Sequence, residues 1–142
     1  MENCHIYLSG AMSGISWEEQ AKWRRQIQNT IRFGDYDCSK KPIYFDPTQY
    51  YNYEEKLHKS EKEVMEFELS ALRKSDLVIV NFNEPRSIGT AIELAIAKEL
   101  RIPIIGLNKD KKEIHPWLLE CTTRMCDDME ELIQYIIDFY LN

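Results

Sequence analysis

The chain has 142 residues, of which 44% are hydrophobic and 30% are charged. These values are ordinary for a globular protein, so they argue against a disordered or membrane-embedded chain, and the length suits one domain with a sizeable core. The net charge of -6 argues against a nucleic-acid polymer as the main partner, because phosphate backbones bind basic surfaces. A small anionic ligand is compatible with that charge.

The cysteines and the hydropathy pattern indicate in which cellular compartment the protein is expected. Reduced thiols in a cytosolic protein are expected, because the cysteines show no CxxC or other metal-binding spacing, with a disulfide or a zinc site as the alternative. A signal-peptide h-region and a run of about 18 apolar residues are both missing. We therefore expect a soluble, cytoplasmic protein that does not act at a membrane. The four cysteines are Cys4, Cys38, Cys121 and Cys126.

The first predicted strand covers residues 4–8 and is followed by SGAMSG at residues 9–14. Gly10 and Gly14 permit a tight turn with exposed backbone amides, as loops that bind phosphate or sugar require. The pattern is not GxGxxG, and a simple strand-to-helix turn explains it equally well.

A helix at residues 17–33 and a strand at residues 43–45 come next. The helix carries a core-facing apolar stripe, ends before Gly34 and includes Trp23, Ile27 and Ile31 in that stripe. After the strand, Asp46 and Pro47 begin a polar loop with three tyrosines. The loop suits either a cover over a ring-shaped ligand or a surface connection, and its length favours the cover. The tyrosines are Tyr50, Tyr51 and Tyr53.

The next predicted helix spans residues 60–74, with Ser60 and Glu63 as a capping box. Its inner face consists of apolar residues that recur at intervals of three and four, namely Val64, Met65, Leu69, Ala71 and Leu72. Glu68 lies inside this apolar stripe, whereas Glu61 and Glu66 lie nearer the polar side.

Two β-branched runs, at residues 76–82 and 101–107, predict parallel strands joined by a crossover helix. Between residues 88 and 97 the only ionisable side chain is Glu93, and a helix that is apolar on nearly every face is normally buried. A lone buried carboxylate is costly, so Glu93 is either paired structurally or used in chemistry. Its place near the carboxyl end of a central strand favours chemistry, because ligands bind there in open α/β sheets. The positive end of the helix is expected to keep the carboxylate ionised as a nucleophile.

Glu68 and Glu93 are expected to meet at one end of the sheet. The helix at residues 60–74 runs antiparallel to the following strand, and eight residues at about 1.5 Å each place Glu68 roughly 12 Å back from Asp76. The strand rises by a comparable distance at about 3.3 Å per residue. By the same reasoning Asp76 lies at the opposite end and is a structural cap.

A polar loop precedes the helix of Glu93. Ser87 and nearby amides suit an anion, and Ser87 also suits the N-cap; the two roles are compatible. Arg86 is the only cation of this loop, with Glu84 beside it, which leaves a phosphate site incomplete. The loop also contains Asn81 and Asn83.

The last third contains a strand ending at Leu107, a charged loop, the segment IHPWLLE, a strand near residues 122–125 and a helix at residues 127–141. His115, beside Trp117, is either a ligand or an ordinary surface histidine. The final helix has acidic polar positions, which argue against a membrane-surface role. Its core-facing stripe is Met129, Leu132, Ile133, Ile136, Ile137 and Tyr140.

Five strands with helices between them predict an α/β fold. We expect a flavodoxin-like (Rossmann-like), doubly wound sheet of about five parallel strands in the order 2-1-3-4-5, with helices on both faces.

Three stretches resemble the signatures of the nucleoside 2-deoxyribosyltransferase superfamily, which includes the related deoxynucleoside 5′-monophosphate N-glycosidases. They are YLSGAMSG, ELSALRKSDLVIV and SIGTAIELAIA. The resemblance implies a single domain of this type over residues 1–142. It also implies that Glu93 is the nucleophile, that Glu68, at a position usually held by Asp, binds or protonates the departing base, and that Tyr7 places the nucleophile.

The resemblance also implies a substrate site and an assembly. Superfamily members that act on free nucleosides carry Asp six residues before the nucleophile, whereas the monophosphate hydrolases carry Ser, as Ser87 is here. His115 falls where the family reaches the 5′ end of a substrate in a neighbouring subunit, so a homodimer or larger homo-oligomer with shared sites is expected. The implied substrate-binding residues are Ser9, Gly10, Met12, Ser13, Asn81, Ser87, Gly89 and His115.

The expected activity is cleavage of the N-glycosidic bond of a 2′-deoxynucleoside and transfer of the deoxyribosyl group to another nucleobase. The partners are then a nucleoside or nucleotide and a free base, and the resemblance implies no metal and no organic cofactor. The alternatives are a hydrolase of (deoxy)nucleoside 5′-monophosphates and a non-catalytic module that senses nucleotides.

Overall fold

Five parallel strands form one sheet in the computed structural model, which describes residues 1–51 and 60–142. Their order is β2-β1-β3-β4-β5, which confirms the predicted order. The strands are β1 (Glu2–Gly10), β2 (Lys40–Phe45), β3 (Leu77–Asn81), β4 (Ile104–Leu107) and β5 (Arg124–Cys126).

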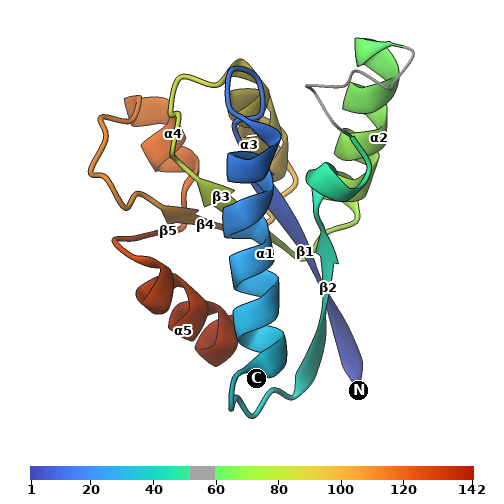
Figure 1. The fold of residues 1–142 in the computed structure, drawn as a ribbon, viewed down its shortest axis with the longest axis vertical. Coiled ribbons are helices and arrows are strands. Elements are labelled where there is room, and N and C mark those ends of the chain that lie inside the picture. Colours follow the sequence, from blue (N-terminus) through green and yellow to red (C-terminus); the bar gives the residue numbers. More distant parts are fainter. Residues whose placement is uncertain (52–59) are drawn as a thin grey trace.

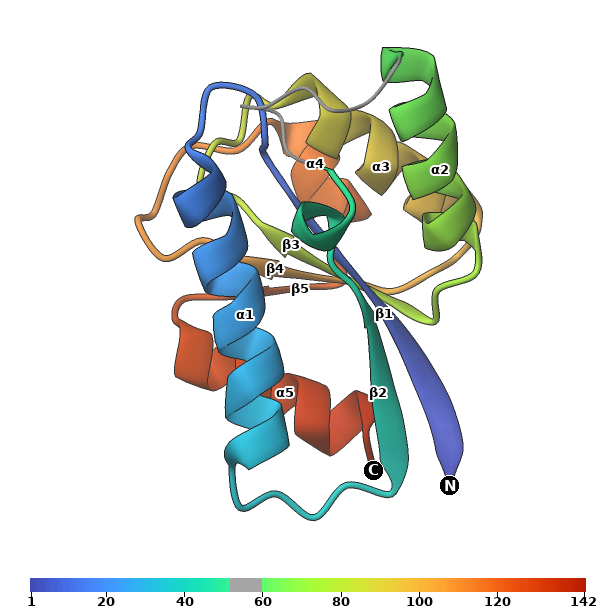
Figure 2. The same cartoon turned by 45° about the vertical axis from the view of Figure 1, so that its right-hand side comes forward.

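Helices cover both faces of this sheet, as predicted (Figure 1). Helices α1 and α5 pack on one face, and α2, α3 and α4 pack on the other, as the turned view in Figure 2 also shows. The helices are α1 (Trp17–Phe33), α2 (Glu61–Arg73), α3 (Ile88–Glu99), α4 (Pro116–Cys121) and α5 (Met129–Tyr140), with a 3-10 turn η1 (Pro47–Gln49).

Strand β3 explains why the sheet is covered on both sides. Its side chains alternate between two cores: Leu77 and Ile79 pack with α1 and α5, whereas Val78 and Val80 pack with α2 and α3. All four are fully buried. A continuous apolar run is typical of a central strand in a parallel sheet.

The helix starts follow the capping residues in the sequence. The side chain of Ser60 accepts a hydrogen bond from the amide of Glu63 at 3.1 Å, and Asp128 accepts one from Glu131 at 2.8 Å. Asp76 has the predicted structural role, because its carboxylate accepts the amide of His5 at 2.8 Å at the start of β3. No helix in residues 1–51 and 60–142 is long and apolar enough to cross a membrane.

Two features differ from simple sequence rules. Gly34 follows α1 with φ −78°, so the left-handed conformation common at helix ends does not explain it. A Cβ there would lie 2.5 Å from the carbonyl oxygen of Thr30 and 2.4 Å from the ring of Tyr36, so close packing requires the glycine.

The second difference concerns α3, which the sequence predicts to be buried on nearly every side. One side packs on the sheet, but Ile88 is 79% exposed and Ile92 is 42% exposed. An apolar side of this helix is therefore exposed among residues 1–51 and 60–142.

Candidate active site

A pocket of about 290 Å³ lies beside the carboxyl ends of β1 and β3, between α2, α3 and the loop after β1. It is lined by seven of the residues that the sequence nominates. They are Gly10, Met12, Ser13, Glu68, Ser87, Gly89 and Glu93.

The carboxylate of Glu93 is held by two side chains of β1. The hydroxyl of Tyr7 donates a hydrogen bond to Oε2, and the hydroxyl of Ser9 donates one to Oε1 at 3.0 Å. Tyr7 and Ser9 point to the same side of β1 because residues two apart share a face of a strand. Both residues are fully buried, so the carboxylate has a fixed orientation toward the pocket.

Two opposing influences act on the protonation of Glu93. Burial raises the pKa of Glu93, whereas the hydrogen bonds from Tyr7 and Ser9 and the charge of Arg24 lower it. The net direction is upward. Ionisation is therefore harder than the dipole of α3 alone predicts, and it depends on these three neighbours.

Glu68 and Glu93 converge on the pocket, as predicted, and their protonation is coupled. Burial raises the pKa of Glu68 to about 8, and the charge of Glu93 adds to this rise. Glu68 therefore keeps its proton at neutral pH, whereas the hydrogen bonds from Tyr7 and Ser9 favour the carboxylate form of Glu93. Burial and the charge of Glu93 also raise the pKa of Tyr7 well above its usual value, so Tyr7 remains a donor.

The beginning of α3 faces the same pocket. The hydroxyl oxygen of Ser87 accepts the amide of Thr90 at 3.3 Å, which makes Ser87 the N-cap and leaves the hydroxyl hydrogen able to donate to a ligand. The first-turn amides of a helix have no partner within the helix. A Cβ on Gly89 would meet nothing within 4 Å, so this glycine leaves open space in front of α3.

The loop after β1 is held by α1. The side-chain amide of Gln20 donates to the carbonyl oxygens of Met12 at 2.8 Å and Ile15 at 2.6 Å. Gly14 has φ +78°, which favours glycine. A Cβ on Gly10 would lie 2.8 Å from ring carbon Cζ2 of Trp23, so packing between β1 and α1 requires this glycine.

Two nominated residues lie away from the pocket of their own chain. Asn81, at the end of β3, lines a separate groove beside α1 and α5. His115 is the N-cap of α4, where Nδ1 accepts the amide of Trp117 at 3.1 Å, and its side chain is exposed. The structure therefore brings neither residue to Glu93 within one chain.

The described part of the tyrosine-rich loop borders the site. The ring of Tyr50 stacks on Phe45 at 5.1 Å between centroids, and Phe45 stacks on Tyr7 at 5.2 Å. Phe45, Tyr50 and Phe67 line a second cavity of about 160 Å³ beside Glu68. Tyr51 is buried, and Tyr53 lies outside the described residues.

Arg24 also lines the pocket, and the sequence reasoning missed it. Its side chain is fully buried on α1, on the same face as Gln20, Ile27 and Ile31. The signal was present in the sequence, because a glutamine and an arginine continue the apolar spacing of that helix. A charged residue at a core position is an indication of function or of structural pairing.

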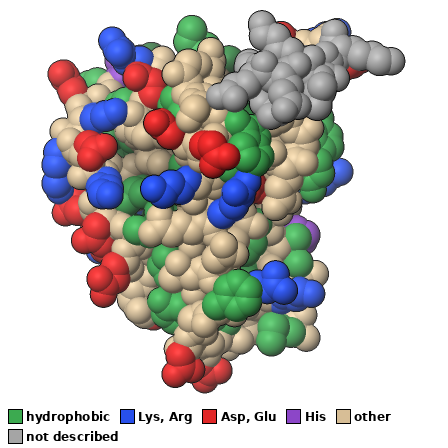
Figure 3. All heavy atoms as spheres, in the orientation of Figure 1, with side chains coloured by type: hydrophobic (Ala, Val, Ile, Leu, Met, Phe, Trp, Pro, Cys, Tyr) green, Lys and Arg blue, Asp and Glu red, His purple; other side chains and the backbone are tan. Residues whose placement is uncertain are grey.

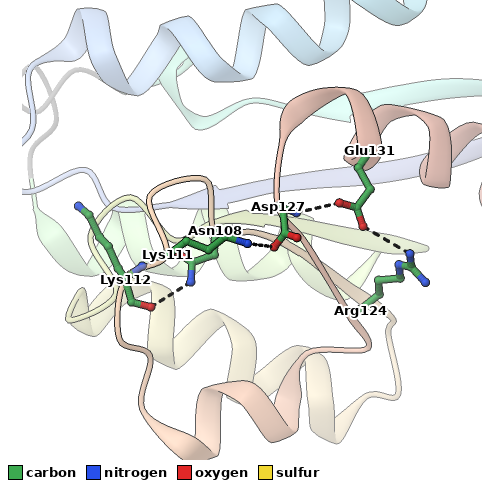
Figure 4. A network of polar contacts seen from close by, with 6 residues as sticks. All are labelled: Asn108, Lys111, Lys112, Arg124, Asp127 and Glu131. Atoms are coloured by element: carbon green, nitrogen blue, oxygen red, sulfur yellow. Dashed lines mark hydrogen bonds and ion pairs between the residues drawn. The ribbon is translucent and has the colours of Figure 1, made fainter.

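A polar network joins the loop at residues 108–112 to Asp127, just before α5 (Figure 4). The side chain of Asn108 donates to the carbonyl oxygen of Lys112 at 2.9 Å, and Lys111 pairs with Asp127. The ammonium of Lys112 donates to the carbonyl oxygen of Asn83. The loop before α3 is therefore contacted by one cation from the loop at residues 108–112, and it also carries the exposed Arg86, which pairs with Glu84 at 3.2 Å.

Charges of both signs are mixed on one face of the protein. On the face shown in Figure 3, Lys and Arg side chains are interspersed with Asp and Glu side chains. Within residues 1–51 and 60–142, no group of three or more His, Cys, Asp or Glu side chains could hold a metal ion.

Comparisons with known proteins identify a family and a fold. The family model described as Domain of unknown function (DUF4406) matches residues 4–106. No curated protein matches the chain.

Among solved structures, a 2-deoxyribosyltransferase from Bacillus psychrosaccharolyticus is similar with a TM-score of 0.68 and 17% identity, over 93% of this chain and 92% of that one. A 2-desoxiribosyltransferase from Leishmania mexicana is similar with a TM-score of 0.67 and 17% identity, over 97% of this chain and 99% of that one. A CMP N-glycosidase from Clostridium botulinum is similar with a TM-score of 0.57 and 18% identity, over 96% of this chain and 99% of that one. The predicted resemblance to the nucleoside 2-deoxyribosyltransferase superfamily is thus confirmed at the level of the fold.

Proposed function

We propose that this chain, which belongs to the DUF4406 family, is an enzyme that cleaves the N-glycosidic bond of 2′-deoxynucleosides and transfers the deoxyribosyl group to another nucleobase. The observation that carries the proposal is a pair of carboxyl groups that line one pocket in different surroundings. Glu93 is oriented through both oxygens, and Glu68 has a pKa of about 8. Two such groups are what a nucleophile and a proton donor require.

In the first step, a carboxylate oxygen of Glu93 bonds to C1′ of the sugar while the bond from C1′ to the base nitrogen breaks. The electron pair of that bond goes to the base, and Glu68 donates its proton to the departing base. The products are a free base, a glycosyl ester on Glu93 and an ionised Glu68.

In the second step, a nitrogen of the incoming base bonds to C1′ and Glu93 leaves as a carboxylate. Glu68 accepts the proton that the incoming base loses. Before the attack, Tyr7 and Ser9 donate hydrogen bonds to the carboxylate of Glu93, which fixes its direction of attack.

A hydrolase of (deoxy)nucleoside 5′-monophosphates is the second candidate, and the start of α3 favours it. Ser87 has a hydroxyl hydrogen for an anion, the helix N-terminus attracts negative charge, and Lys112 contacts the preceding loop. Water then takes the place of the second base. A non-catalytic sensing module is the third candidate; it predicts nucleotide binding without release of the base.

We further propose that one domain spans residues 1–142 and assembles as a homodimer or larger oligomer. The support is the position of the uncovered apolar residues: Ile88 and Ile92 are exposed and also line the pocket. A neighbouring subunit would bury them and bring its own His115 to this rim. Mass measurement in solution tests the assembly, and a monomer at micromolar concentration contradicts it.

The test of function supplies deoxynucleosides and their 5′-monophosphates, each with and without a second free base, and follows the bases by chromatography. Exchange of bases supports the transferase, and release without exchange from monophosphates supports the hydrolase. Glu93→Gln is expected to abolish either activity, whereas Glu99→Gln, on the exposed side of the same helix, is expected to retain it. Full turnover by Glu93→Gln contradicts the proposal.

A further inference from the structure

Arg24 is a buried cation whose hydrogen bonds go to backbone carbonyls. Its Nε donates to Leu8 at 3.1 Å, Nη1 to Gln20 at 2.8 Å and Nη2 to Gly10 at 3.3 Å. These bonds satisfy the guanidinium without neutralising it. A full positive charge is therefore fixed in place at the wall of the pocket.

The hydrogen bonds of Arg24 connect it to Glu93 through the end of β1. Leu8 and Gly10 flank Ser9, which donates to the carboxylate of Glu93. The guanidinium therefore hydrogen-bonds to the end of β1 on both sides of Ser9, which orients Glu93. An arginine with a purely structural role could make the same hydrogen bonds. A role in the ionisation of Glu93 requires in addition the positive charge.

Several acidic groups surround this charge on different elements. Asp46, before η1, has the largest charge interaction with Arg24, followed by Glu93 on α3, Tyr7 on β1 and Glu68 on α2. Asp46 also accepts hydrogen bonds from Thr48 and Gln28, which satisfy its carboxylate with neutral donors. Glu61, from the start of α2, also faces the pocket and raises the pKa of Glu68.

The attraction of Arg24 lowers the pKa of Glu93 and that of Glu68. Burial lowers the pKa of Arg24 itself, but a guanidinium remains charged throughout the range in which enzymes work. Both carboxyl groups interact with the same cation. Removal of the Arg24 charge would therefore raise the pKa of Glu93 and the pKa of Glu68.

We propose that Arg24 is a positioning residue for Glu93 in the glycosyl transfer proposed above: its guanidinium, anchored to the carbonyl oxygens on both sides of Ser9, brings a buried positive charge to the wall of the pocket, favours the carboxylate form of Glu93 and thereby shifts the pH range of the site. Arg24 acts through Glu93 and not on the substrate. The inference rests on the proposed function for its effect on rate, but its effect on ionisation can be measured without any turnover.

The first test is the pH profile of base release by Arg24→Met, Arg24→Lys and the control Arg25→Met. Arg25 is exposed on the same helix, and its replacement changes the net charge equally. Arg24→Met is expected to move both limbs of the profile upward by at least about one pH unit, because an opposite charge nearby shifts a carboxyl group by about that much or more. Arg25→Met is expected to leave the limbs in place.

The lysine variant separates charge from packing. Arg24→Lys keeps the charge but cannot make all three carbonyl hydrogen bonds, so we expect a lower melting temperature with pH limbs close to those of the unmodified protein. Limbs that move as far in Arg24→Lys as in Arg24→Met overturn the proposal. A lower rate in both variants with unmoved limbs also overturns it, because that is the result of a structural role.

The second test follows the glutamate side-chain carbons by ¹³C NMR as pH changes, with Glu93→Gln to assign the signal. In the ligand-free protein, Glu93 is expected to titrate at higher pH in Arg24→Met than in Arg25→Met. If Arg24→Met does not fold, Arg24→Gln takes its place. An unmoved titration refutes the role of Arg24, whereas a moved titration in a protein that releases no base refutes only the proposed function.

Discussion

Replacing Glu68 with glutamine should make the protein more stable at high pH, and this effect can be measured without knowledge of the substrate. The pKa of Glu68 is raised from 4.5 to about 8 in the folded protein. Between these values the unfolded chain has lost the proton and the folded chain has kept it, so the stability of the native protein falls as pH rises. Glutamine has no proton to lose.

The size of the effect follows from the same values. The interval from 4.5 to about 8, at about 1.36 kcal/mol for each pH unit, gives an upper limit of about 5 kcal/mol. Glu68 is only half-buried, and water in the pocket screens its charge, so we expect about 2 kcal/mol. The contribution changes mainly between pH 5 and pH 8 and is complete above about pH 9.

The assay is urea unfolding of the unmodified protein and Glu68→Gln at pH 5, 7 and 9. Glu66→Gln is the matched control, because Glu66 is exposed on the same helix. The stability of Glu68→Gln relative to the unmodified protein should increase steadily with pH, and that of Glu66→Gln should not. A constant difference between Glu68→Gln and the unmodified protein at all three pH values would refute the reasoning.

Three further changes test the geometry of the pocket. Tyr7→Phe removes a hydrogen bond to the carboxylate of Glu93; at about 1.5–3 kcal/mol for a bond to a charged group, base release should slow by roughly 10- to 100-fold, and an unchanged rate contradicts the assigned role. Ser87→Asp should weaken the binding of a 5′-monophosphate far more than that of the nucleoside, as calorimetry can determine, because the new carboxylate repels phosphate. Gly10→Ala should destabilise the protein by about 1–3 kcal/mol in thermal unfolding, because its methyl group overlaps Trp23; a neutral effect would contradict the close packing.

Much of the fold follows from local patterns in the chain. The run from Leu77 to Val80 is apolar at every position because both faces of β3 are covered, and this pattern alone predicts a central parallel strand. Ser60, Ser87 and Asp128 mark helix starts because each accepts an amide that the first turn leaves unpaired. These signals are local, and the structure confirms them.

The site was only partly accessible to the same reasoning. Helical spacing predicts that Glu68 and Glu93 approach each other, and they do. Arg24 continues the apolar spacing of α1, but it was missed because this spacing does not show its partners, and the carbonyl oxygens of Leu8 and Gly10 lie in another element. The exposure of Ile88 could not be predicted either, because apolar composition does not show which side of α3 the chain leaves uncovered.

The most direct test of the central assignment is a search for the covalent intermediate on Glu93. The protein is mixed with a deoxynucleoside or its 5′-monophosphate, quenched in acid after a few milliseconds to seconds, digested and examined by mass spectrometry. The account predicts that a peptide containing Glu93 gains the mass of the glycosyl group, and that this product disappears when a second base is added before the quench. Base release at an undiminished rate by Glu93→Gln, or a glycosyl group on any other residue, would contradict it.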